Sequence, residues 1–152
     1  MRLRGYRDGD RALLTGRWLP GELLGLPLPG WPPLAEPTTV PPPSGPGDEL
    51  CVAPGAFVRY TDIDWVGRGA RVETGRAPDA PTPPEALLEA AVAHGFHRLN
   101  LRRLYGWVTP AAPAPTTALT EAGFTREASV PEHLWLGGRA VEREIWGALR
   151  HD

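Results

Sequence analysis

The sequence contains no lysine, a single cysteine and a single methionine, and no apolar run long enough to cross a bilayer. The absence of lysine excludes any reaction that passes through a lysine Schiff base. Cys51 has no partner for an internal disulfide, and without a Cys/His cluster we expect no metal site. Residues 1–8 lack the apolar run of a signal peptide, so we expect a cytoplasmic protein with no membrane partner.

A strong charge of either sign is also missing. The formal net charge is −2, which gives no general attraction for nucleic acid. Hydrophobic residues make up 41% and charged residues 22% of the chain, as in ordinary soluble globular proteins. A length of 152 residues suits one domain, so we expect a single domain over residues 1–152.

Proline is abundant instead, and it crowds residues 27–46. Proline lacks the N–H that strands and helices need, so this segment is predicted to be an extended loop, partly in the polyproline II conformation. One interpretation is a ligand for SH3-like domains. A stiff connector lying on the domain is favoured, because leucine and tryptophan side chains in and beside the segment favour burial.

Along the chain, some segments have the two-residue apolar repeat of strands and others the 3.6-residue repeat of helices. The clearest helix is residues 85–96, where Leu87, Leu88 and Ala91 form an apolar stripe after prolines suited to a first turn. Gly123 is placed to end a second helix, and Gly137-Gly138 suits a hairpin turn. The predicted helices are 11–18, 85–96 and 116–122, and the predicted strands are 2–7, 49–52, 56–65, 69–75, 103–108, 133–136 and 141–149.

Three segments of the C-terminal half carry a family resemblance. Residues 93–104 are similar to a helix end followed by a strand, and residues 118–127 contain a leucine, a small residue, Gly-Phe and a glutamate at fixed spacing. Residues 135–142 are similar to a glycine hairpin that leads into a last strand. In this order the chain resembles the GNAT superfamily of N-acetyltransferases, and within it the branch that acetylates ribosomal proteins at their N-termini.

The resemblance implies an α/β (α+β) fold, with one twisted, mixed and mostly antiparallel sheet flanked by helices. It also implies transfer of an acyl group to an amine. In this family the fourth strand splays from the fifth, and the pantetheine arm of the acyl donor lies in the gap. A glycine-containing loop at a helix N-terminus then donates backbone N–H groups to the pyrophosphate.

Residues 76–84 occupy the place of that loop, and the resemblance implies donor contacts from Thr74, Arg76, Ala77 and Thr82. The loop has no glycine, its prolines lack N–H groups, and Asp79 adds a negative charge beside the expected pyrophosphate. Each lost charge-assisted hydrogen bond costs about 1.5–3 kcal/mol. The sequence therefore predicts weak binding of ordinary acetyl-coenzyme A. An acyl-coenzyme A held differently, a carrier-protein thioester and an aminoacyl-tRNA remain open as donors.

Candidate catalytic and acceptor residues come from the strands around this gap. Glu73 on the fourth strand is the candidate general base and Tyr105 on the fifth the candidate acid. Asp62 and Asp64 are two residues apart on the third strand and should therefore share one face. With His133, they are candidates for binding a small-molecule or peptide amine. Each has an ordinary structural alternative, namely an exposed strand carboxylate, a packed aromatic ring or a solvated surface group.

Two functions remain open. The first is an N-acyltransferase, which could serve a biosynthetic pathway. The second is a degenerate GNAT-fold protein that binds a ligand or partner without catalysis, as the proline-containing donor loop would permit. Arginines 98, 102 and 103, with Arg76, could contact the phosphates of a carrier arm or a tRNA end. The edge strands could support a homodimer.

Overall fold

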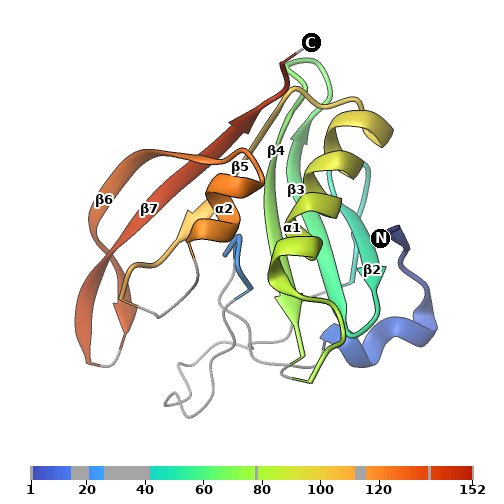
Figure 1. The fold of residues 1–152 in the computed structure, drawn as a ribbon, viewed down its shortest axis with the longest axis horizontal. Helices are drawn as coiled ribbons and strands as arrows, with labels where there is room; N and C mark the ends of the chain where they lie inside the picture. The colour runs from blue at the N-terminus through green and yellow to red at the C-terminus, as the bar shows by residue number, and fades with distance from the viewer. Residues whose placement is uncertain are drawn as a thin grey trace.

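The computed structural model of the protein describes residues 2–14, 21–25, 42–77, 79–111, 116–136 and 138–151 (Figure 1). Two short segments are not α-helical: η1 is a 3-10 helix and η2 a π-helical turn. In chain order the elements are β1 (Arg4–Gly5), η1 (Asp8–Leu14), β2 (Glu49–Ala53), β3 (Ala56–Asp64), β4 (Gly69–Arg76), α1 (Pro84–Ala93), η2 (His94–Arg98), β5 (Arg103–Val108), α2 (Thr117–Glu121), β6 (Thr125–Leu136) and β7 (Arg139–Leu149).

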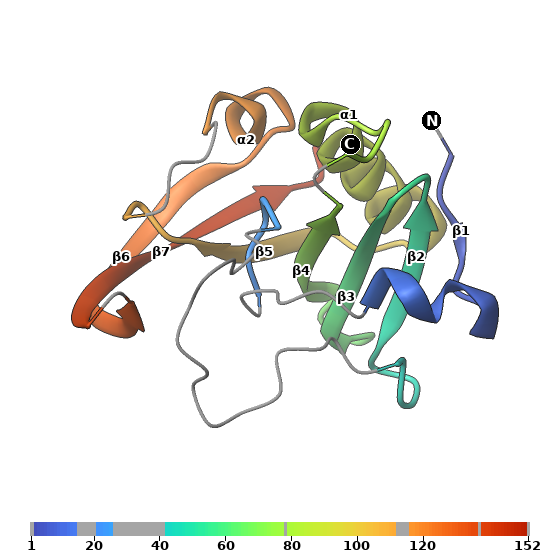
Figure 2. The same cartoon turned by 90° about the horizontal axis from the view of Figure 1, so that it is seen from below.

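The described residues form one seven-stranded sheet in the order β1-β2-β3-β4-β5-β7-β6. Neighbouring strands pair antiparallel except β4 and β5, which run parallel. Helices α1 and α2 lie on one side of the sheet and η1 lies on the other (Figure 2). The predicted mixed, mostly antiparallel sheet with flanking helices is confirmed.

The main core lies between the sheet and α1. Side chains alternate across a strand, so Tyr60, Val72 and Leu104 from three neighbouring strands point to the same face and are fully buried. Leu88 and Ala91 of α1 pack onto them. The Tyr60 hydroxyl donates a hydrogen bond of 2.5 Å to the Ala91 carbonyl, which ties the helix to the centre of the sheet.

A smaller core occupies the opposite face. Leu50, Val52 and Phe57 on β2 and β3 pack with Leu14 at the end of η1. Further along β3 and β4 this face carries polar side chains, including Arg59, Thr61, Arg71 and Glu73. The change from apolar to polar side chains along one face sets the position of a candidate site.

Several predicted boundaries differ from the structure. The largest difference is β6, which begins at Thr125 and not at residue 133. Nearly every residue of this edge strand is exposed, so its sequence lacks the alternation that marks a half-buried strand. Strand 2–7 pairs only at Arg4–Gly5, and helix 85–96 passes into the π-helical turn η2 after Ala93.

Some predictions fall outside the described residues. These are residues 27–41 of the proline-rich segment, 15–18 of the first predicted helix, 112–115 of the loop after β5, and Gly137 of the last hairpin. In the part of the chain that is described, no helix is both long enough and apolar enough to cross a membrane.

Gly75 of β4 offers a test of this packing. A Cβ atom at Gly75 would lie 2.1 Å from the Phe57 ring, and the ring is 1% exposed. We expect Gly75→Ala to lower the free energy of unfolding by about 1–3 kcal/mol, measured by urea denaturation. Gly5→Ala is the matched control, since no atom lies within 4 Å of its Cβ. Equal stability of the two variants would show that β3 and β4 do not pack in this register.

Candidate functional site

Strands β4 and β5 separate where the resemblance places the acyl donor. Their parallel pairing covers Gly69–Arg103, Ala70–Leu104 and Arg71–Tyr105. Beyond this point residues 21–25 lie between the two strands, and Glu22 forms a parallel bridge with Trp107. We call these five residues the 21–25 segment.

The 21–25 segment forms backbone hydrogen bonds with both β4 and β5. The Thr74 N–H of β4 donates to the Glu22 carbonyl at 3.1 Å. On the β5 side the Leu23 N–H donates to the Trp107 carbonyl, and the Trp107 N–H donates to the Gly21 carbonyl, both at 2.9 Å. The Thr74 hydroxyl donates to the Leu23 carbonyl at 2.8 Å. The segment therefore satisfies the polar backbone groups that the divergence of the strands leaves unpaired.

Glycines allow this close approach. Gly25 has a φ of +60°, and a Cβ there would lie 2.5 Å from the Thr74 carbonyl oxygen. A Cβ at Gly106 of β5 would lie 2.6 Å from the Leu23 side chain and 2.7 Å from the Val72 carbonyl oxygen. Leu23 is consequently fully buried in the gap.

A buried ion pair anchors the segment to β7. Glu22 is 2% exposed and Arg143 is 6% exposed, and the Arg143 guanidinium lies 2.9 Å from the Glu22 carboxylate. Thr109 hydrogen-bonds the same carboxylate and accepts a hydrogen bond of 3.3 Å from Arg143 Nε. Burial raises the pKa of the Glu22 carboxyl, and the nearby guanidinium opposes that rise. Burial also lowers the pKa of the Arg143 guanidinium.

The four predicted donor residues are all engaged within the chain. Besides the Thr74 contacts, the Arg76 guanidinium donates to the Thr82 carbonyl at 3.2 Å and the Thr82 hydroxyl to the Pro54 carbonyl at 2.9 Å. The Ala77 N–H donates to the Gly55 carbonyl at 2.9 Å. A space of about 10 Å³ lies between the 21–25 segment, β4 and α1. The residues present do not fit coenzyme A in the pose that the resemblance implies.

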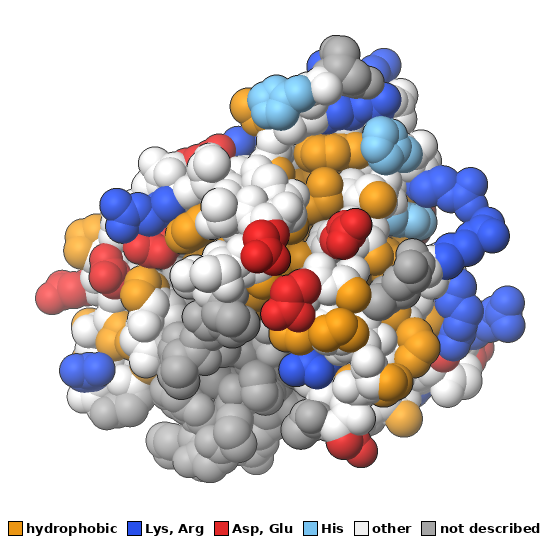
Figure 3. All heavy atoms as spheres, viewed as in Figure 1, with side chains coloured by type: hydrophobic (Ala, Val, Ile, Leu, Met, Phe, Trp, Pro, Cys, Tyr) orange, Lys and Arg blue, Asp and Glu red, His pale blue; other side chains and the backbone are white. Residues whose placement is uncertain are grey.

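Charge around α1 is also unfavourable for a diphosphate. Acidic side chains gather near the middle of the face that α1 and α2 cover, and basic side chains follow one edge of it (Figure 3). Asp79 and Glu85 are exposed at the start of α1, and Glu89 and Glu121 are exposed further along this face. Negative charge at a helix N-terminus complements the helix dipole and repels a second anion.

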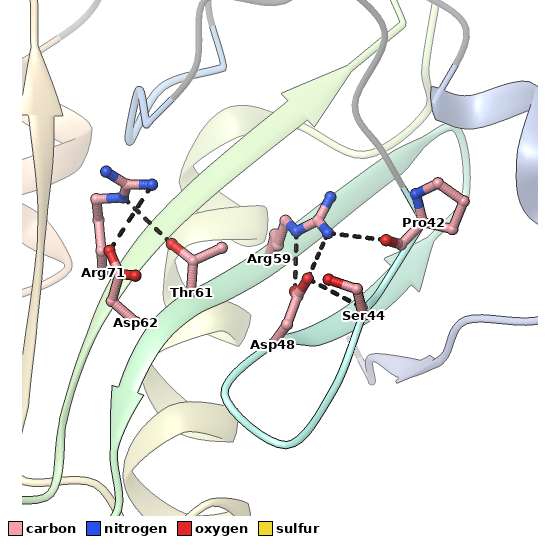
Figure 4. A network of polar contacts seen from close by, with 7 residues as sticks. All are labelled: Pro42, Ser44, Asp48, Arg59, Thr61, Asp62 and Arg71. Carbon is pink, nitrogen blue, oxygen red and sulfur yellow. Dashed lines mark hydrogen bonds and ion pairs between the residues drawn. The ribbon is translucent and has the colours of Figure 1, made fainter.

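A polar groove of about 560 Å³ lies on the opposite face of β3 and β4 (Figure 4). Its firmest contact is between Arg59 of β3 and Asp48. The guanidinium donates to both carboxylate oxygens, at 2.9 Å from Nε and 2.5 Å from Nη2. The residues that line the groove are Ser44, Gly47, Asp48, Arg59, Thr61, Asp62, Ile63, Arg71 and Glu73.

The two predicted acceptor aspartates have different surroundings. Asp62 lines the groove at a bulge in β3, has a φ of +53°, and lies 4.0 Å from the Arg71 guanidinium. Asp64 instead accepts hydrogen bonds from the N–H groups of Val66 and Gly67 at 3.0 and 2.8 Å. The bulge breaks the alternation that placed both aspartates on one face, and Asp64 stabilises the turn after β3.

Glu73, the predicted base, lines the groove next to the gap. Its Oε2 accepts a hydrogen bond of 2.6 Å from the Gly21 N–H, so the 21–25 segment contacts this carboxylate too. Tyr105, the predicted acid, is half-buried at the last β4–β5 pair before the strands separate, with the Arg103 guanidinium 5.4 Å from its ring. In the described part of the chain no hydrogen bond joins Tyr105 to Glu73.

His133 lies on β6 and stacks on Trp107 of β5, with ring centroids 4.4 Å apart. The Arg143 guanidinium lies 5.1 Å from the Trp107 ring. A Cβ at Gly21 would come within 2.7 Å of the same ring. His133, predicted to bind the acceptor, is therefore connected through Trp107 to the side chains around the 21–25 segment.

Other candidate groups offer less chemistry. Cys51 lies 3.4 Å from His94 Nε2 but is buried, and burial raises the pKa of its thiol to about 11. A thiol with so high a pKa is a poor nucleophile. Of the predicted phosphate-binding arginines, Arg103 makes a bidentate ion pair with Glu127. Among the described residues, no cluster of three or more His, Cys, Asp or Glu side chains could hold a metal ion.

Comparison with solved structures identifies the architecture. A variant of the spermidine N-acetyltransferase SpeG from Vibrio cholerae matches with a TM-score of 0.63 and 22% identity, over 68% of this chain and 66% of that chain. The chain has the GNAT fold. Structures of the same enzyme as a dodecamer and in complex with manganese ions match with TM-scores of 0.62 and 0.63 at 22% identity, over 68% of this chain and 65% of each.

The similarity covers part of each structure and is not detected by comparisons of sequence. This chain spans slightly less than two thirds of the length of these enzymes. No protein-family model and no curated protein matches its sequence. The structural matches support the GNAT fold that the sequence resemblance implied, and they are spermidine enzymes rather than acetyltransferases of ribosomal proteins.

Sequence reasoning missed Glu22, Arg143 and the position of the 21–25 segment. The expected burial of leucine near the proline-rich stretch was correct for Leu23. That expectation did not say that Leu23 would lie between β4 and β5. The glycines at positions 21 and 25 were the available signal, because both adopt positive φ in a close backbone approach. The partner of Glu22 lies 121 residues away, which no local pattern reveals.

The groove yields a prediction about stability. Asp48→Asn removes the charge opposite Arg59, whose side chain is only 4% exposed. We expect a loss of about 2–3 kcal/mol in the free energy of unfolding. Asp62→Asn is the matched control, because Asp62 is 69% exposed at a longer distance from its arginine and asparagine tolerates positive φ. The control should change stability by about 1 kcal/mol or less. A control as unstable as Asp48→Asn would contradict this difference between the two pairs.

Proposed function

We propose that the protein is a GNAT-type N-acyltransferase that acts on a positively charged amine of a small molecule. The observation that carries the proposal is the position of Glu73: a carboxylate on β4, at the point where β4 and β5 diverge, that also lines the polar groove. A base at this place can reach an amine in the groove and an acyl group in the gap, once the gap is free.

The charges of the groove suit a cationic acceptor. Asp48 is neutralised by Arg59, whereas Asp62 is exposed and makes only a distant contact of 4.0 Å with Arg71. Asp62 and Glu73 can therefore receive an ammonium group. The structural neighbours bear the name of spermidine N-acetyltransferases, which supports a small-molecule amine over a peptide and makes spermidine a suitable first probe.

In this proposal Glu73 accepts a proton from the acceptor ammonium, which leaves a lone pair on the nitrogen for attack on an acyl carbonyl. Tyr105 is the proposed donor of a proton to the leaving group, and Asp62 with His133 orients the acceptor. An acyl thioester supplies the activated carbonyl. Holding both substrates in one orientation contributes most of the rate enhancement.

The proposed donor is an acyl thioester. Acyl-coenzyme A is favoured by the fold of the neighbours, but it requires displacement of the 21–25 segment. Nothing in the comparisons favours a carrier protein, a tRNA or the ribosomal-protein branch. A role in biosynthesis, a cytoplasmic location and a homodimer stay predictions.

A second candidate function is a GNAT-fold binding protein without catalysis. The occupied gap favours it, because Thr74, Arg76, Ala77 and Thr82 are all bonded within the chain. A protein of this kind would use the polar groove for ligand binding and would retain the segment permanently.

Acetylation of spermidine and other amines by acetyl-coenzyme A, followed by mass spectrometry, separates the two functions. We expect Glu73→Gln to lower kcat by about 10²–10⁴-fold, since glutamine still accepts the Gly21 N–H but cannot take a proton. The amine KM should change less than kcat, because Asp62 still receives the ammonium group.

Glu142→Gln is the matched control for Glu73→Gln. Glu142 is an exposed carboxylate on β7 that also accepts one hydrogen bond, from Ser129, and lies outside the groove. It should retain wild-type turnover. Equal turnover in the wild type and Glu73→Gln would refute the role of Glu73. Absence of any acylated amine at saturating donor would favour the binding protein.

A further inference from the structure

We infer that the 21–25 segment competes with the acyl donor for the gap between β4 and β5, and that the buried Glu22–Arg143 pair sets the affinity for the donor. The inference rests on the proposed function, because it requires a donor that enters this gap. It adds to that function a built-in competitor and names the residues that hold it.

Competition follows from the shared backbone groups. A pantetheine arm in the gap would need the N–H groups and carbonyls that β4 and β5 expose where they diverge. The Thr74 N–H, the Trp107 N–H and the Trp107 carbonyl already bond to residues 21–23. On the α1 side of the segment, a space of about 10 Å³ is close to the minimum for one water molecule. Segment and donor cannot occupy the gap together.

Packing and one buried ion pair also hold the segment. Leu23 fills the space over Gly106, and Gly25 lies against the Thr74 carbonyl. The Glu22–Arg143 pair joins the segment to β7 across a buried interface. A donor must replace these contacts, so its apparent affinity equals its intrinsic affinity multiplied by the fraction of molecules in which the gap is open.

The same segment also contacts the proposed base. The Gly21 N–H donates to Glu73 Oε2 at 2.6 Å, which occupies a lone pair that proton transfer would use. Departure of the segment would therefore free the gap and release the carboxylate in one step. Donor binding and activation of the base are coupled through five residues.

Gly25→Ala tests the inference. Its new Cβ would lie 2.5 Å from a backbone oxygen of β4, which cannot move aside as a flexible side chain could. The variant should disfavour the closed gap. Calorimetric titration with coenzyme A is expected to show binding about tenfold or more tighter than in the wild type.

Gly138→Ala is the matched control. Gly138 also has positive φ, +80° against +60° for Gly25, but no atom lies within 4 Å of its Cβ. It carries a similar backbone strain without touching the gap, so its affinity for coenzyme A should equal that of the wild type. A gain in both variants would overturn the inference.

Glu22→Gln provides an independent variant should Gly25→Ala fail to fold. It preserves the shape of the side chain and removes the charge opposite Arg143, so it should also bind coenzyme A about tenfold or more tightly. Amide hydrogen exchange, measured without ligand, reports the opening directly. The Thr74 and Trp107 N–H groups should exchange faster in both variants than in the wild type.

The combined results distinguish the inference from the proposed function. Faster exchange with tighter binding supports both. Faster exchange with unchanged binding in a wild type that acylates amines overturns the competition and leaves the function intact. Faster exchange with no binding of coenzyme A by any variant overturns the competition and removes coenzyme A as the donor as well.

Discussion

The structure depends on how the chain satisfies the backbone where β4 and β5 separate. Two parallel strands that diverge expose N–H and carbonyl groups inside the protein, and unpaired polar groups there are costly. Residues 21–25 meet this need from far away in the sequence, through Thr74 on one side and Trp107 on the other. The buried Glu22–Arg143 pair then fixes the segment to β7. The Gly21 N–H of the same segment bonds to Glu73 at the edge of the polar groove.

In this GNAT fold the residues predicted to contact the donor are bonded within the chain. A loop with prolines in place of glycines offers few N–H groups, and those of Ala77 and Ala80 are bonded to neighbouring carbonyls. The exposed acidic residues around α1 add repulsion of an anionic donor (Figure 3). On the other face, β3 and β4 line a polar groove in which Asp62 is exposed and Asp48 is paired with Arg59 (Figure 4). The face proposed to bind the acceptor thus carries carboxylates, while the gap proposed for the donor is occupied by residues 21–25.

Much of the fold could be predicted from local pattern. The helix around Leu87 and Leu88 and the strand at Arg103–Val108 have clear apolar periodicity, and the structure confirms both. Strand β6 was underestimated, because an exposed edge strand has no buried face to impose alternation. The prolines of residues 76–84 predict a weak donor loop, and that prediction is untested. The position of the 21–25 segment could not be predicted, because its contacts with Thr74, Trp107 and Arg143 depend on tertiary structure. The pairing of Asp62 and Asp64 on one face failed at a bulge that leaves no signature in the sequence.

The most direct test is a pair of crystal structures, one of the free protein and one grown with saturating coenzyme A. The free protein should show residues 21–25 between β4 and β5, with Glu22 bonded to Arg143 and Gly21 to Glu73. In the complex the segment should have left the gap and the coenzyme should contact the Thr74 backbone. A free protein with an empty gap, or a complex in which coenzyme A binds while the segment keeps its place, would contradict the competition between them.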